Sequence, residues 1–186
     1  MTDLDDIHYI DKITDGDVNA FVHIMRRHER MIFTIVNKIL ANEQDSEDVV
    51  QEIFIKAYQS LHKFRRDSQF STWLYRIAYN TTISHVRKSR KDQEMNSDAL
   101  QDLPDDEVDE SHNSVQKEEL LSYLDEALQK LKPEDALMIT MFYMNNHSMQ
   151  EIGEITGHSV INVKVKLHRI RKFMNFEINK SIRHGK

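Results

Sequence analysis

The chain has 186 residues, of which 39% are hydrophobic and 30% charged, enough for one ordinary soluble domain or two small ones. Its 4 Gly and 2 Pro are few for the turns of an all-β fold, and the lack of Cys excludes disulfides, thiolate metal sites and cysteine nucleophiles. The acidic N-terminus is unlike a secretory signal, and no stretch approaches the roughly 18 apolar residues of a membrane helix.

The net charge of −6 conceals an uneven distribution along the chain. Residues 18–90 hold twelve bases and seven acids, and residues 148–186 hold eight bases and three acids. Between these two basic blocks, residues 91–119 hold eleven acids and two bases. Local patches rather than the total charge set phosphate affinity, so nucleic acid remains a candidate ligand. Solvated helix faces would have the same charges, and the pattern alone does not separate the two interpretations.

Apolar residues at three-to-four spacing predict three helices in the first half of the chain. Their ranges are 18–40, 45–62 and 72–88. Asp15 or Asp17 is the expected N-cap of the first helix, and Asp45 that of the second. The segment 64–70 lacks a helical period and is predicted to be a loop, with Phe64 and the nearby Trp73 assigned to the core.

The middle of the chain breaks this pattern. Residues 91–115 are rich in acids and poor in apolar side chains, which predicts a linker without a packed structure. Helical order resumes near Val115, and Pro133 at a first helical position indicates a restart. Residues 134–144 form the next expected helix, whose Met residues are interpreted as core filler rather than a metal site.

A helix-turn-helix is the most informative local signal, starting at Ser148. Ser148 and Glu151 form a capping box, Gly157 fits a left-handed helix end, and Ser159 caps the following helix. Gly153 is small enough to let another helix approach. The inward face of the last helix is expected to consist of Val160, Val163, Leu167 and Ile170. An ordinary helical hairpin is the alternative, but the cap, the glycine turn and the basic outer face together favour DNA binding.

The expected fold is therefore all-α, with two small helical domains joined by an acidic flexible linker and a helix-turn-helix in the second domain. The predicted boundaries are 1–90 for the first domain, 91–115 for the linker and 116–186 for the second domain.

Two segments in this order resemble a known family. The run Asp45–Tyr58 and the segment Phe64–Ala78, with Asn80, resemble region 2 of extracytoplasmic-function sigma factors, and residues 148–172 are similar to their region 4. The resemblance covers about residues 15–180. It implies a transcription initiation factor, not an enzyme, that binds RNA polymerase core enzyme, directs it to −10/−35 promoters and melts the −10 element. It implies no cofactor and no metal.

The resemblance also implies roles for individual residues. Contacts with core polymerase are expected from Asp48, Gln51 and Glu52. The −10 DNA is expected to contact Arg65, Arg66, Ser68, Gln69, Phe70, Ser71, Arg76, Asn80, Arg87 and Lys88. The −35 DNA is expected to contact Ser159, Asn162, Lys164, Lys166, Arg169 and Arg171. The family often has small residues early in this last helix where Val160-Ile161-Asn162 stands here, which leaves the DNA sequence open.

The implied partners are the clamp coiled coil of the largest polymerase subunit, the polymerase flap, promoter DNA and an anti-sigma factor. The protein is expected to be a cytoplasmic monomer without membrane insertion, held at the inner membrane through the anti-sigma partner. A coil of about 25 residues spans roughly 25–30 Å, whereas two major-groove turns are on the order of 70 Å apart. The acidic linker must therefore stretch on promoter DNA, and a basic polymerase channel would hold it.

Three other classes of function compete. A polymerase-independent, dimeric helix-turn-helix regulator needs a palindromic site and leaves the region 2 segment without a role. An enzyme is disfavoured because the ten His are scattered and no metalloprotease, phosphate-loop or dinucleotide motif occurs. A pure interaction protein, such as an adaptor, would combine tight polymerase binding with weak DNA binding.

Overall fold

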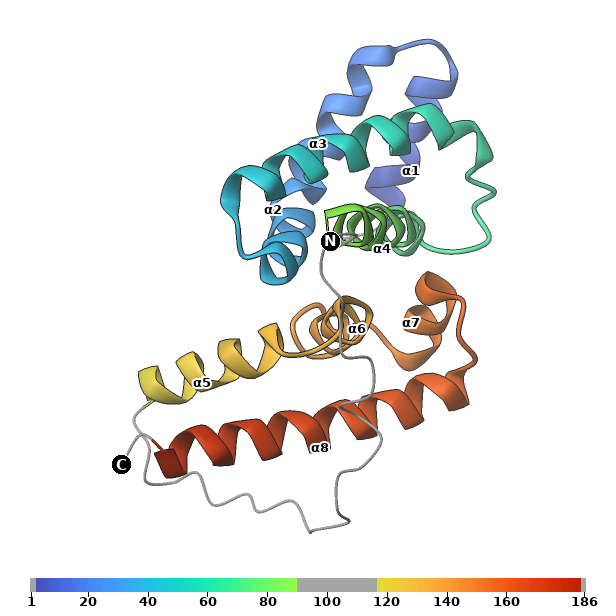
Figure 1. Cartoon of the computed structure of the whole chain (residues 1–186). Helices are drawn as coiled ribbons and strands as arrows, with labels where there is room; N and C mark the ends of the chain where they lie inside the picture. The colour runs from blue at the N-terminus through green and yellow to red at the C-terminus, as the bar shows by residue number, and fades with distance from the viewer. Residues whose placement is uncertain (1–2, 90–116, 185–186) are drawn as a thin grey trace.

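The computed structural model describes residues 3–89 and 117–184, and these residues form helices, turns and loops with no strand. The all-α prediction is therefore confirmed for this part of the chain. The predicted linker 91–115 lies outside the described residues. Figure 1 shows an N-terminal group of helices, α1 to α4, above a C-terminal group, α5 to α8.

The N-terminal group contains the three predicted helices, with shifted ends. Their observed bounds are α2 Phe21–Leu40, α3 Glu43–Ser60 and α4 Phe70–Ser89, with short 3-10 turns at Val18–Ala20 and Leu61–Lys63. Asp17 precedes the first of these turns without a side-chain capping bond. Asn42, rather than Asp45, caps α3, because its side chain accepts the N–H of Asp45 at 3.1 Å.

A further helix, α1 (Asp3–Thr14), was not predicted. Ile10 is buried in the core, and Ile7 and Ile13 pack against it partly buried, so a short apolar spacing does mark this helix. Polar contacts with α2 add to this packing. The buried Asp6 lies 3.1 Å from Nε2 of the buried His28. Arg27 donates to Asp5 at 2.5 Å and reaches Asp6 at 3.4 Å. These polar contacts and the burial of Ile10 together fix α1 against the rest of the N-terminal group.

The C-terminal group is built from four helices: α5 Lys117–Gln129, α6 Pro133–Tyr143, α7 Met149–Thr156 and α8 Val160–His184. Pro133 is at the first position of α6, as predicted. The capping box of Ser148 and Glu151 is present, and Gly157 ends α7 with φ 77°. Ser159 Oγ accepts the N–H of Asn162 at 3.2 Å, which confirms it as the next cap.

Two details of the helix-turn-helix differ from expectation. Val160 was predicted to point inward, but it is 48% exposed because the first turn of α8 projects beyond the core. A Cβ added at Gly153 would lie 2.8 Å from the backbone oxygen of His158. The glycine therefore admits the turn between α7 and α8, not another helix. Val163, Leu167 and Ile170 are buried as predicted.

The two helical groups pack directly on one another. Helix α4 contacts α6 and α7, and α2 contacts α6 (Figure 1). The buried apolar side chains of both groups belong to one continuous hydrophobic cluster. Within residues 3–89 and 117–184, no helix is both long and apolar enough to cross a membrane.

Candidate nucleic-acid interface

One face of α4 carries the polar residues expected at the −10 element. Arg76, Asn80, Ser84 and Lys88 follow each other at four-residue intervals, so they line one side of the helix. All four are exposed. Arg87 lies next to them, with 74% of its side chain exposed. Ser84 was not among the predicted residues, although the same spacing identifies it.

The loop before α4 places several of the residues predicted to contact −10 DNA at or near the surface. Arg65 and Gln69 are exposed, and Ser68 and Ser71 are partly buried. Arg66 has a φ of 62° and forms an ion pair with Asp11 of α1. The loop is therefore tied to α1, a contact that the sequence did not indicate.

Phe70 belongs to the core in this structure. Its side chain is 0% exposed and lies with its ring centre 5.4 Å from that of Phe64 and 5.5 Å from that of Trp73. Phe64 is buried and Trp73 is partly buried against the same core, as expected. The Phe70 ring cannot reach DNA from this position, so its role is to hold the start of α4.

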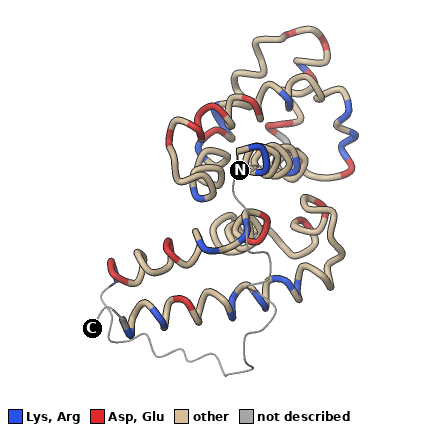
Figure 2. The backbone as a smooth tube through the Cα atoms, in the orientation of Figure 1, with Lys and Arg blue, Asp and Glu red and all other residues tan. Residues whose placement is uncertain are grey.

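The residues expected at the −35 element lie along α8, but not all of them face one way. Asn162, Lys164 and Arg169 are exposed. Lys166 reaches the buried carboxylate of Asp135 at 3.4 Å. Arg171 donates back to the carbonyl of Leu167 at 3.4 Å. Figure 2 shows the basic segments of α8 distributed along the helix.

Exposed apolar side chains accompany these polar ones at the start of α8. Ile161 is 76% exposed, and Val160 and Val165 are also exposed. Sequence reasoning assigned Val160 to the core and gave Ile161 no role. Apolar side chains in a major groove contact the methyl group of thymine, so these residues belong to the candidate interface.

A separate acidic face lies on α3, where core-polymerase contacts were expected. Asp48, Gln51 and Glu52 are exposed and share one side of the helix. Glu52 pairs with Lys56 at 2.7 Å. Ile55, four residues after Gln51, is 50% exposed. The sequence analysis gave it no role, although this spacing places it on the same face.

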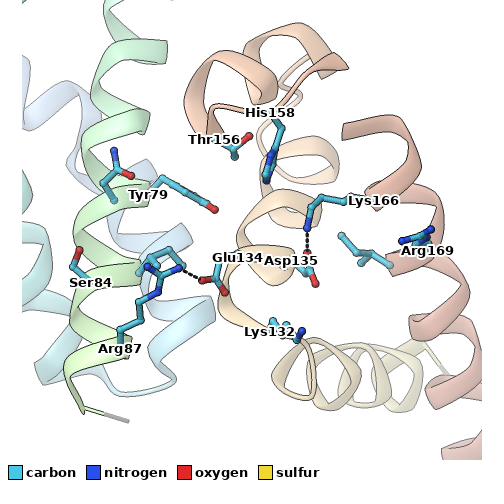
Figure 3. Close-up of a pocket in the computed structure, with 13 residues that line it drawn as sticks. Tyr79, Ser84, Arg87, Lys132, Glu134, Asp135, Thr156, His158, Lys166 and Arg169 are labelled. Carbon is cyan, nitrogen blue, oxygen red and sulfur yellow. Dashed lines mark hydrogen bonds and ion pairs between the residues drawn. The ribbon is translucent and has the colours of Figure 1, made fainter. Parts of the chain in front are cut away.

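A cavity of about 570 Å³ lies between the two helical groups (Figure 3). Asn80, Ser84 and Arg87 line it from α4, and Lys166 and Arg169 line it from α8. Residues of both predicted DNA interfaces therefore face the same space. The remaining lining residues that Figure 3 labels are Tyr79, Lys132, Glu134, Asp135, Thr156 and His158.

Ion pairs and burial control the electrostatics of this cavity. Arg87 contacts Glu134 at 2.9 Å across the boundary between the groups, and Figure 3 shows both side chains pointing toward each other. Burial, together with Glu134 and Asp135, raises the pKa of Tyr79 to about 12, with Arg87 acting in the opposite direction. The Tyr79 hydroxyl therefore stays protonated near neutral pH.

A second, apolar groove of about 980 Å³ opens between α5, α6 and α8. Leu121, Leu124, Tyr143 and Met144 line it and are exposed. Lys38 of α2 also lines the groove and pairs with Asp125 at 2.6 Å. This groove was not predicted, although the leucine spacing of α5 could have indicated a face that its own group leaves open.

No group of three or more His, Cys, Asp or Glu that could hold a metal occurs within 3–89 and 117–184. The exposed faces carry groups that suit recognition. Basic and amide side chains suit phosphates and base edges, and the acidic and apolar faces suit protein partners.

Comparisons with known proteins assign two parts of the chain to family regions. Residues 24–92 match the family model of sigma-70 region 2, and residues 121–174 match that of sigma-70 region 4. The chain is 31% identical to the ECF RNA polymerase sigma factor SigW of Bacillus subtilis, over 91% of this chain and 94% of that protein. It is 32% identical to the ECF RNA polymerase sigma-E factor of Escherichia coli K12, over 94% of both chains.

Two solved structures share the fold. CnrH, in complex with the cytosolic domain of CnrY, superposes with a TM-score of 0.65 at 20% identity, over 92% of this chain and 96% of that chain. The sigma factor RpoE of Bartonella quintana, in complex with the anti-sigma factor NepR, gives 0.64 at 17% identity, over 86% and 96%. The two family regions and the full-length relatives show that this chain belongs to the extracytoplasmic-function sigma factors of the sigma-70 family, which direct RNA polymerase to specific promoters.

Proposed function

We propose that the exposed face of α4 recognises and melts the −10 element of a promoter. The observation that carries this assignment is the row of Arg76, Asn80, Ser84 and Lys88 at four-residue spacing, exposed on a helix whose start is fixed in the core. Arginine and lysine hold phosphates, and an amide such as that of Asn80 suits a base edge. The loop residues that complete the surface are Arg65, Arg66, Ser68, Gln69 and Ser71.

The start of α8 reads the −35 element in this proposal. Asn162 and Lys164 are exposed in its first turns, where a recognition helix meets base edges, and Arg169 follows at a position suited to phosphate. Ser159 caps the helix with its hydroxyl, so its role is to position the backbone. Lys166 and Arg171 complete the basic surface. Ile161 adds an apolar contact of the kind that thymine methyl groups accept.

The acidic face of α3 docks on the clamp coiled coil of the largest polymerase subunit. Asp48, Gln51 and Glu52 supply charge and hydrogen-bond acceptors, and Ile55 supplies an apolar centre. An apolar centre with a polar rim is the usual composition of a protein interface. The apolar groove between α5, α6 and α8 receives the polymerase flap, which the family resemblance implies for region 4.

The protein acts in the cytoplasm as two domains, 1–90 and 116–186, joined by the acidic linker. An anti-sigma factor regulates it. Support comes from the two structural matches, since CnrH was solved with the cytosolic domain of CnrY and RpoE with the anti-sigma factor NepR.

Transcription with purified core enzyme on a library of random upstream sequences tests the proposal. Transcripts that require this protein and share two motifs at fixed spacing are the expected result. The variant Asn80→Ala should reduce permanganate reactivity of unpaired thymines at the −10 element while binding core enzyme normally. Asp48→Lys should weaken core binding instead. Binding to a palindromic duplex without core binding would favour the dimeric regulator and overturn the assignment.

A further inference from the structure

The loop of residues 65–69, which belongs to the proposed −10 surface, is bound to α1 by an ion pair. Arg66 of this loop donates to the carboxylate of Asp11, 55 residues earlier in the chain. The neighbouring Arg65 is exposed, and within residues 3–89 and 117–184 it forms no ion pair. Two adjacent arginines therefore have different surroundings, although the family resemblance implies −10 contacts for both.

The backbone at Arg66 adopts a conformation that needs support. Its φ of 62° lies in the left-handed region, which a residue with a long side chain seldom adopts. Strained residues of this kind persist where surrounding contacts fix them, and they are frequent at functional sites. The ion pair with Asp11 is such a contact, because it fixes the side chain of the residue at which the loop bends.

Helix α1 is itself fixed well enough to support the loop. Its Ile10 is buried in the core, and its buried Asp6 lies 3.1 Å from Nε2 of His28. The ring of His28 packs edge-on against that of Phe70 at the start of α4, with ring centres 5.7 Å apart. Helix α1 therefore supports both ends of the loop, through the ion pair at one end and through His28 at the other.

We propose that α1 positions the 65–69 loop, with Asp11 holding Arg66 in the conformation that the loop needs to discriminate between −10 bases. Arg66 is then a positioning residue, and Arg65 is the phosphate contact of the loop. Because the carboxylate of Asp11 offsets the charge of Arg66, this arginine adds less attraction for phosphate than Arg65 does. The inference rests on the proposed −10 role of the loop and adds which residues set its shape.

Backbone order parameters of residues 65–68, measured by NMR relaxation in the free protein, test the support of the loop without DNA. The wild type should give values near ~0.85, as for rigid backbone, and Asp11→Asn should lower them toward ~0.6. The matched control is Asp15→Asn, which removes the same charge from an exposed acid with no side-chain bond to the described residues. Its values should equal those of the wild type. Unchanged values in Asp11→Asn would overturn the support of the loop by α1.

Promoter selectivity measures the functional consequence. Templates selected from the random upstream library, and the same templates with single-base changes in the −10 element, are transcribed with core enzyme. Asp11→Asn should lower the ratio of transcripts from original and altered templates about two- to fivefold, the size expected for one exposed ion pair. A loosened loop accepts a wrong base more readily, whereas Asp15→Asn should keep the wild-type ratio. A wild-type ratio in Asp11→Asn would contradict the positioning role.

A charge swap separates positioning from direct contact with DNA. The variant Asp11→Arg/Arg66→Asp keeps the net charge and restores the ion pair in reverse, and Asp tolerates the left-handed region better than most residues. If Arg66 acts through its position, the swap should recover most of the selectivity that Arg66→Gln loses. The ratio of transcripts is the readout, because a uniform loss of DNA affinity does not change it. No recovery would show that Arg66 itself contacts DNA.

The two adjacent arginines give a matched pair of variants. Arg65→Gln should weaken promoter binding on original and altered templates alike and reduce its salt dependence, as expected for a lost phosphate contact. Arg66→Gln makes the same change of charge but should lower the ratio between the templates. The same behaviour in both variants would contradict the different roles of Arg65 and Arg66.

Failure of the proposed function gives a different result. If Gln69→Ala and Asn80→Ala both leave the ratio of transcripts unchanged, the −10 role of the loop and of α4 is wrong, whatever the effect of Asp11→Asn. The order parameters of the free protein do not depend on DNA, so the support of the loop by α1 is tested separately.

Discussion

In the N-terminal group, aromatic side chains hold the loop before α4, whereas in the C-terminal group hydrogen bonds to the backbone hold the turn before α8. Phe64, Phe70 and Trp73 pack around the start of α4. Ser148 and Ser159 accept backbone N–H groups at the starts of α7 and α8. Each device positions a helix for which we propose DNA contacts, one by burial of apolar area and the other by local polar geometry.

The difference has an energetic consequence. Burial of a large ring contributes several kcal/mol, and the contribution depends on many neighbours at once. A cap contributes about 1 kcal/mol and acts within one turn. The loop before α4 should therefore depend strongly on one core residue, while the helix-turn-helix should lose stability in smaller steps.

The largest effect is expected for Phe70→Ala. Removing this fully buried ring should lower the free energy of unfolding by about 3–5 kcal/mol. Urea denaturation followed by the fluorescence of Trp73, the single tryptophan, measures it. Phe176→Ala removes a half-exposed ring from α8 and should cost less than about 1 kcal/mol. Equal losses in the two variants would contradict the core role of Phe70.

A smaller effect is expected for Gly153→Ala. The new methyl group would lie 2.8 Å from the backbone oxygen of His158, so the turn between α7 and α8 must move. We expect a loss of about 1–3 kcal/mol, measured by urea denaturation followed by circular dichroism. Gln150→Ala, at an exposed position of the same helix, should change stability by less than about 0.5 kcal/mol. A neutral Gly153→Ala would show that the turn is looser than described.

Loss of the capping box should lower the free energy of unfolding by less than either Phe70→Ala or Gly153→Ala. Ser148→Ala removes the oxygen that accepts the N–H of Glu151 at 3.2 Å and the hydroxyl that donates to its carboxylate at 2.8 Å. The expected loss of unfolding free energy is about 1 kcal/mol, measured in the same way. Ser122→Ala on the exposed face of α5 is the control and should be nearly neutral. A loss of stability in Ser148→Ala as large as that in Phe70→Ala would contradict the difference between the buried aromatic cluster of the N-terminal group and the caps of the C-terminal group.

The smallest effect concerns pH, at the boundary between the groups. Burial against Tyr75 lowers the pKa of His147, while the carboxylate of Glu151 acts in the opposite direction. The folded state then binds fewer protons than the unfolded state, so stability is full above the ordinary pKa of about 6.5 and falls as the pH drops below it. The variant His147→Gln should not show this fall in stability at low pH.

Glu151 titrates in a different window. Burial alone would raise its pKa, but the backbone N–H and hydroxyl of Ser148, together with His147, bring the pKa below its ordinary value. Its contribution is therefore lost only at pH values below about 4.5. The difference between the free energies of unfolding at pH 7.5 and about 5.5 therefore measures the contribution of His147 with little contribution from Glu151. An unchanged difference between these two pH values in His147→Gln would show that another group is responsible.

Local chemistry made much of the molecule predictable from its sequence. The capping box at Ser148, the left-handed Gly157 and the proline start of α6 depend on residues within one or two turns, and all three are present. Apolar periodicity located α2, α3 and α4, with ends displaced by a few residues. The family resemblance, which rests on segments of the same kind, was confirmed by the comparisons.

Only the tertiary structure decided the rest, because the deciding contacts join residues far apart in the chain. The burial of Phe70 depends on Phe64 and on His28 of α2, and the polar contacts of α1 are with His28 and Arg27. The contacts of Arg76 with Glu154 and of Arg87 with Glu134 span 78 and 47 residues of sequence. Sequence by itself therefore determined the helices, their caps and the family. The packing of one helical group on the other decided which of the predicted DNA-contact side chains are bonded to residues of the other group.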